Sequence, residues 1–302
     1  MVVSASVFSQ DKKFTETEIA VNPIINGTLY LPENPSAKTK LIIMISGSGP
    51  TNRSGNQIGG ITNCSKFLAQ ELAKKDIAVF TYDKRMFALM KAGNIDEKTL
   101  RFDDGIIDTK EVVHFFKSQK KYAKIIVAGH SEGSTVGMIS SQKNVDGFIS
   151  IAGPGRSADE ILSTQLEAQI PTMKKEFDDY LSKLKNGETF ELKNKMLASI
   201  FRESVQPYMI SWFKYDPQDE IKKLNIPVLI INGTKDLQVP VSEAELLKSA
   251  KPNAQLVIVD NMNHVLKNIL GDDTENAASY NNGELPVSNA LVDAVNQFTK
   301  SI

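Results

Sequence analysis

The sequence predicts an α/β protein whose core is a mostly parallel sheet with helices on both faces. Continuous aliphatic runs, which suit strands buried on both faces, alternate with segments of helical periodicity, and an apolar hairpin precedes them. The predicted strands are residues 14–21 and 27–31 in the hairpin, then 41–45, 77–80, 125–128, 148–151, 228–231 and 256–259. The predicted helices are residues 65–74, 103–118, 135–141, 242–250 and 287–298.

The composition of the 302-residue chain is that of an ordinary globular protein, with 41% hydrophobic and 24% charged residues. A formal net charge of -1 provides no global field for nucleic acid, and no apolar run approaches the roughly 18 residues of an integral membrane segment. The single Cys64 excludes an internal disulfide. Because the three histidines show no short metal-ligand spacing, we expect no metal.

The N-terminus gives two expectations for the compartment. As the chain stands it predicts a cytoplasmic protein, because residues 1–10 lack a basic region. If Met1 is not the native start, residues 1–10 resemble the end of a signal peptide and the protein is periplasmic or secreted. The oligomeric state stays open.

A candidate nucleophile follows the run at 125–128. Gly129-His130-Ser131-Glu132-Gly133 is a Gly-x-Ser-x-Gly pentapeptide between a predicted strand and a predicted helix. Such a turn needs small neighbours so that a strained serine can project its hydroxyl. We therefore predict Ser131 as the nucleophile; the alternative is a glycine-rich helix cap.

A serine hydroxyl needs a base within hydrogen-bond reach and an acid that orients the base. His264 lies in a polar loop after the last predicted strand, so we predict it as the base. Asp236 lies in the loop after the run at 228–231, which gives the chain order serine, aspartate, histidine. Asp260 and Asp159 are the alternative acids.

The tetrahedral intermediate of acyl transfer also needs two backbone donors. The amide of Glu132, directly after the nucleophile, is the first. The run at 41–45 leads into a glycine-rich loop, where we predict the Ser48 amide as the second donor and Gly49 as its alternative. This loop lacks the endings of the common phosphate-binding motifs.

These motifs together resemble bacterial α/β-hydrolase carboxylesterases. The matching residues are Gly129 to Gly133, Gly47-Ser48-Gly49-Pro50 with Arg53, residues 233–240, and Asn263-His264-Val265. The family loop commonly reads Gly-Ser-Gly-Pro-x-Asp-Arg-Asp-Gly, so Asn52 and Ser54 depart from it, as does Met86, where a glycine is usual. The resemblance implies the α/β-hydrolase fold and hydrolysis of short acyl esters without a cofactor.

Residues 155–224 interrupt the alternation, because they contain amphipathic pieces but no convincing strand. We expect a helical lid insertion into a core formed by residues 1–154 and 225–302. It should emerge at the sheet edge that carries Ser131 and roof the active site. Its aromatic cluster either packs the insertion onto the sheet or lines the substrate site, and we expect Tyr208, Trp212 and Phe213 to contact substrate.

The predicted activity is cleavage of small or medium carboxylic esters through an acyl-enzyme. Thioesterase, peptidase and acyltransferase activities use the same residues and are the alternatives within enzymes. A non-catalytic binding protein with a hydrolase fold is the alternative from another class. The expected partner is a small-molecule ester.

Overall fold

The computed structural model describes residues 14–302, so the expectation for residues 1–10 lies outside the described part. Its centre is an eight-stranded sheet in the order β1-β2-β4-β3-β5-β6-β7-β8. β1 and β2 form an antiparallel hairpin, β2 is antiparallel to β4, and all remaining pairs are parallel. The strands are Phe14–Ala20, Asn26–Pro32, Lys40–Ile45, Ile77–Tyr82, Ile125–His130, Gly147–Ile151, Val228–Gly233 and Gln255–Val259 for β1 to β8.

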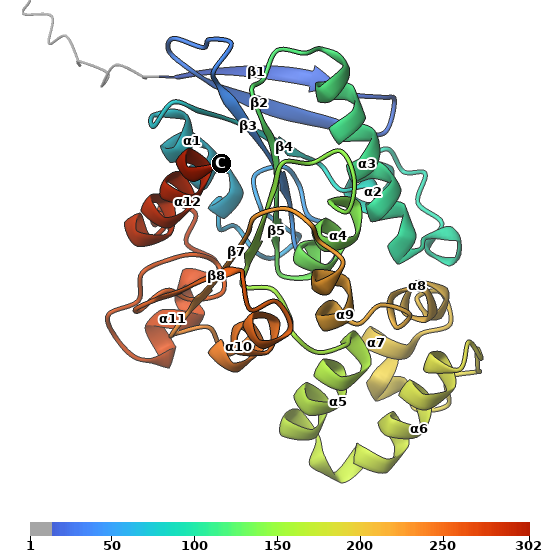
Figure 1. Ribbon diagram of the computed structural model, residues 1–302. Coiled ribbons are helices and arrows are strands. Elements are labelled where there is room, and N and C mark those ends of the chain that lie inside the picture. The colour runs from blue at the N-terminus through green and yellow to red at the C-terminus, as the bar shows by residue number, and fades with distance from the viewer. Residues whose placement is uncertain (1–13) are drawn as a thin grey trace, which may run out of the picture.

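Helices cover both faces of this sheet, which confirms the predicted fold class (Figure 1). α1 (Cys64–Ala73) and α12 (Asn289–Ser301) pack on one face, and α3 (Phe102–Ser118), α4 (Glu132–Ser140) and α10 (Val241–Ala250) pack on the other. Successive strand side chains point to opposite faces, so the continuous aliphatic runs supply both cores. In β3, for example, Ile42 belongs to the core beneath α1 and Ile43 to the core beneath α3.

Each predicted strand and helix has a counterpart that differs from it by at most three residues at either end. Two helices of the core were not predicted, α2 (Arg85–Lys91) and α11 (Asp273–Ser279). α2 buries none of its residues, and α11 is short and polar. Both helices are only seven residues long, too short for the helical periodicity of an apolar face to be recognised.

The segment between β6 and β7 is helical and has an apolar cluster of its own. Its helices are α5 (Ala158–Gln169), α6 (Lys174–Lys185), α7 (Ala198–Phe201), α8 (Gln206–Trp212) and α9 (Pro217–Lys222), with 3₁₀ turns at Pro171–Met173 and Lys195–Leu197; a further turn, Glu97–Thr99, precedes α3. Phe177, Leu184 and Phe201 are fully buried within the cluster. In Figure 1, α5 to α8 form a group beside the sheet. Among the described residues, no helix is long and apolar enough to span a bilayer.

Candidate active site

Ser131 occupies a sharp turn between β5 and α4. Its backbone φ of 55° and ψ of -125° are strained for a residue with a side chain. The turn is also crowded: a Cβ on Gly129 would lie 2.1 Å from the Gly133 carbonyl oxygen, and one on Gly133 would lie 2.6 Å from the Ser46 carbonyl oxygen. Both glycines of the pentapeptide are therefore required by close backbone approach.

Two loops at the carboxyl ends of β7 and β8 bring the predicted acid and base to this serine. His264 Nε2 lies 3.1 Å from Ser131 Oγ, and its Nδ1 lies 2.9 Å from Asp236 Oδ2. The other carboxylate oxygen of Asp236 accepts the amides of Gln238 at 2.9 Å and Val239 at 2.8 Å. These bonds fix the carboxylate, so the structure joins Asp236, His264 and Ser131 in one hydrogen-bond chain.

The alternative acids lie elsewhere. Asp260 is exposed, whereas Asp159 belongs to the insertion and pairs with Lys185 at 2.5 Å. Neither makes a hydrogen bond with His264 among the bonds of residues 14–302. Asp236 is thus the carboxylate that contacts the imidazole.

The two predicted oxyanion donors lie on either side of Ser131. Glu132 follows it directly, and a Cβ on Gly47, the residue before Ser48, would lie 3.1 Å from Ser131 Cβ. Neither the Ser48 amide nor the Glu132 amide donates a hydrogen bond to another group within residues 14–302. Both N–H groups are therefore available to an incoming oxyanion.

Charged contacts over long sequence separations hold the loop that carries Ser48. The Arg53 guanidinium and the Arg53 amide bind the Asp83 carboxylate at 2.7 and 2.8 Å. The Lys84 amide donates to the Thr51 carbonyl at 3.1 Å. The segment after β4 thereby fixes the loop after β3, and the family departures at Asn52 and Met86 leave this contact intact.

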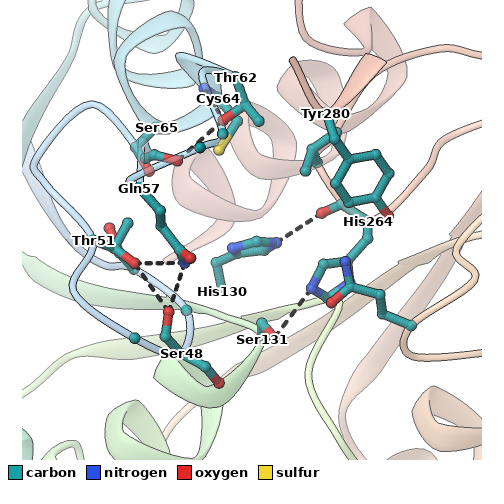
Figure 2. A pocket seen from close by; sticks show the side chains of 18 of the residues that line it. Ser48, Thr51, Gln57, Thr62, Cys64, Ser65, His130, Ser131, His264 and Tyr280 are labelled. Atoms are coloured by element: carbon teal, nitrogen blue, oxygen red, sulfur yellow. Dashed lines mark hydrogen bonds between the residues drawn. The ribbon is translucent and has the colours of Figure 1, made fainter. Parts of the chain in front are cut away.

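Ser131 and His264 open into a cavity of about 440 Å³ (Figure 2). Many of its lining residues are neutral and polar, among them Thr51, Gln57 and Tyr280. Of the described residues, no aspartate, glutamate, lysine or arginine lines it, and none of residues 155–224 does. The cavity therefore suits an uncharged small molecule.

A family model described as BD-FAE matches residues 28–250, which is more than half of the chain. The chain belongs to the BD-FAE family. Esterase EstD of Thermotoga maritima is 28% identical over 270 residues, covering 84% of this chain. The chain spans 61% of the length of that curated relative.

Solved structures that resemble this BD-FAE protein share its fold. Est1E from Butyrivibrio proteoclasticus superposes with a TM-score of 0.60 at 19% identity, covering 95% of this chain and 98% of that one. The Pyrococcus furiosus esterase Pf2001 superposes with a TM-score of 0.57 at 17% identity, covering 96% of this chain and 91% of that one. The α/β-hydrolase fold that the motifs implied is thus found.

The aromatic residues expected at the substrate are not brought to this cavity. The indole of Trp212 stacks on Phe102 at the start of α3, with ring centroids 5.7 Å apart and planes at 8°. Phe213 is buried in the apolar cluster of the insertion. Tyr208 contacts Phe102 edge-on, and its hydroxyl lies near the Glu132 side chain. The packing alternative accounts for Trp212 and Phe213.

His130 has a place that the sequence analysis did not give it. Its Nε2 donates to the His264 carbonyl oxygen at 2.8 Å, and Figure 2 shows the ring beside that of His264. Burial, with a smaller contribution from His264, lowers the pKa of His130 to about 4. His130 is thus a neutral support for the loop that carries His264.

A buried amide network joins the loops of Asp236 and His264. Asn263 Nδ2 donates to Asn276 Oδ1 at 2.9 Å, and Asn276 Nδ2 donates to the Lys235 carbonyl at 2.8 Å. Both asparagines are fully buried. The neighbours of the acid and the base are therefore linked through α11, which sequence patterns alone did not reveal.

Proposed function

We propose that this BD-FAE protein is a serine hydrolase that cleaves small, uncharged carboxylic esters. The observation that carries the proposal is the continuous hydrogen-bond chain from Asp236 through His264 to a serine at a strained turn. An imidazole held in this way can take the serine proton while the carboxylate stabilises the imidazolium that forms. Similarity to EstD, which is named as an esterase, supports the same reaction class.

In the proposed cycle, Ser131 Oγ attacks the ester carbonyl carbon as His264 Nε2 accepts its proton. The amides of Ser48 and Glu132 stabilise the oxyanion, and each such donor typically contributes about a hundredfold to a thousandfold in rate. His264 then protonates the alcohol that leaves, and the acyl group remains on Ser131. Water, deprotonated by His264, releases the acid.

The cavity supports the choice of substrate. A volume of about 440 Å³ accommodates a small or medium acyl group, and a wall without charged side chains provides no ion pair for a charged one. Est1E has been solved with ferulic acid bound, so an ester of a hydroxycinnamic acid belongs among the test substrates. Thioester and peptide cleavage remain alternatives that use the same groups.

We also propose that residues 155–224 form a helical cap distinct from a core of residues 1–154 and 225–302. The support is the separate apolar cluster that contains Phe177 and Phe201. Tyr208 brings the cap close to the site, because its hydroxyl lies near the Glu132 carboxylate.

The first prediction tests the nucleophile. Ser131→Ala should lower ester turnover by about 10⁵-fold or more and leave the melting temperature near that of the wild type, because the hydroxyl reacts but fills no core space. The assay uses p-nitrophenyl esters of increasing chain length, methyl ferulate, a thioester and a peptide anilide. A fluorophosphonate should label the wild type but not the variant. Turnover above a few per cent in the folded variant, or an unlabelled wild type, would refute the proposal.

A further inference from the structure

Lys84 reaches the proposed oxyanion hole from the short connection between β4 and α2. Its Nζ donates to the Gly47 carbonyl oxygen at 2.8 Å and to Glu132 Oε1 at 2.7 Å. The exposed fraction of the Lys84 side chain is 15% and that of Glu132 is 2%, so the ion pair is largely withdrawn from water. The ammonium therefore contacts Gly47, the residue before Ser48, and Glu132. It thus contacts both segments that supply the proposed oxyanion donors.

The contact with the Gly47 carbonyl affects the Ser48 amide because the two groups are covalently linked. The Gly47 carbonyl and the Ser48 N–H belong to the same peptide group. A cation bound to the oxygen of a peptide polarises that peptide and strengthens its N–H as a donor, an effect of about 10–30% per bond in hydrogen-bonded chains. Lys84 thus acts on one oxyanion donor through its own peptide group.

The second donor is coupled to Lys84 through the Glu132 side chain. The amide of Glu132 is the other proposed donor, and its carboxylate binds the Lys84 ammonium and lies near the Tyr208 hydroxyl. Burial, with the neighbouring Glu132 carboxylate, raises the pKa of the Tyr208 hydroxyl, so Tyr208 stays a neutral donor. Lys84 is therefore the cation that offsets this buried negative charge where an oxyanion must form.

We propose that Lys84 is a positioning residue for the oxyanion hole, aligning the Ser48 and Glu132 amides and polarising the Gly47–Ser48 peptide. The inference rests on the proposed function, because it concerns the hole used in ester hydrolysis. It goes beyond neutralising a buried carboxylate. An ammonium that served only Glu132 would have no need of the Gly47 carbonyl.

The experiment separates these two roles with four variants and p-nitrophenyl acetate as substrate. Lys84→Met removes both contacts. Lys84→Met combined with Glu132→Gln removes the ammonium and the buried charge together, while the glutamine amide retains an oxygen for the Tyr208 hydroxyl. Lys84→Arg keeps the charge. Arg85→Met is the matched control, because Arg85 pairs with buried Asp108 at 2.5 Å but, among the described residues, forms no hydrogen bond or ion pair with the loop of Ser48.

For each variant we would measure kcat, KM, the melting temperature and the inhibition constant of a trifluoromethyl ketone, which forms a tetrahedral oxyanion on the serine. Lys84→Met should lower kcat at least about tenfold, less than loss of a whole donor, with KM within twofold. The inhibition constant should rise by the same factor as kcat/KM falls. Lys84→Arg should retain more activity than Lys84→Met, and Arg85→Met should lower the melting temperature with kcat within twofold.

The double variant decides between the roles. We expect it to stay at least about tenfold below the wild type in kcat, because the Gly47 peptide still lacks its donor. Recovery to the wild-type kcat would overturn the inference and leave Lys84 as a neutralising cation, and so would a kcat of Lys84→Met within twofold of the wild type. If Lys84→Met does not fold, the double variant, which buries no unpaired charge, answers alone. Activity that survives in Ser131→Ala would instead reject the proposed function itself.

Discussion

The carboxyl edge of the sheet and the insertion at residues 155–224 are organised by different forces. At the sheet edge, loops far apart in sequence are held by hydrogen bonds and ion pairs, such as those of Arg53 with Asp83 and Asn263 with Asn276. In the insertion, apolar side chains pack around Phe177 and Phe201, and most ion pairs lie on the surface.

This difference separates two kinds of functional evidence. A buried polar group costs free energy unless it forms hydrogen bonds of good geometry. The hydrogen bonds at the sheet edge therefore hold the side chains of the site in fixed positions. Apolar packing fixes the insertion without requiring any single atom to be in one place. An aromatic cluster was therefore a weaker indicator of substrate contact than a short motif of polar residues.

The largest effect that tests this comparison concerns the orienting acid. Asp236→Asn should lower kcat by about 10³- to 10⁴-fold, because the amide cannot stabilise the imidazolium and can hold the imidazole in the wrong tautomer. Steady-state kinetics on a p-nitrophenyl ester measure it. Asp260→Asn is the matched control, since Asp260 is exposed and makes no hydrogen bond with His264 among those of the described residues. A larger loss in Asp260→Asn would mean that Asp236 is not the acid.

Trp212→Ala tests the insertion. Loss of the ring stacked on Phe102 should lower the free energy of unfolding by about 3 kcal/mol, measured by denaturant titration, and should leave the ranking of ester chain lengths unchanged. Tyr280→Ala is the counterpart, because Tyr280 lines the cavity and its truncation should reorder the ranking. If Trp212→Ala instead changed the ranking of ester chain lengths at unchanged stability, the indole would contact the substrate.

The sequence predicted most of the sheet and the chain order of the three site residues. β3 to β7 were recognisable because strands buried on both faces leave uninterrupted aliphatic runs. β8 is a partly exposed edge strand, but it keeps an aliphatic run. Ser131 was recognisable because the turn tolerates only glycine at two nearby positions. These features are local, so they are visible along the chain.

Other features depend on contacts between distant residues and were missed. α11 was missed because Asn276 attaches it to the site by hydrogen bonds, without an apolar stripe. Lys84 was missed, since the carbonyl it binds lies 37 positions away. His130 was not predicted to have a role, because the His264 carbonyl that it binds lies 134 positions away in the sequence.

The smallest expected effect concerns His130, which lies at the sheet edge and is buried as a neutral ring. Its pKa of about 4 lies below the value of about 6.5 for an exposed imidazole, so between these values the unfolded chain binds a proton that the folded protein does not. The contribution of His130 to stability is therefore complete above about pH 6.5 and is lost as the pH falls toward 4. Between pH 7 and pH 4.5 this loss should be about 2 kcal/mol.

His130→Gln isolates this contribution, because a glutamine amide can donate to the His264 carbonyl but takes up no proton in this range. The free energy of unfolding of both proteins would be measured from pH 7.5 to 4.5, since other groups change the stability of both proteins with pH. The wild type should lose about 2 kcal/mol more than the variant. Equal losses would show that His130 is protonated in the folded protein at pH 4.5, and the neutral ring would then not be what supports the loop of His264 in acid.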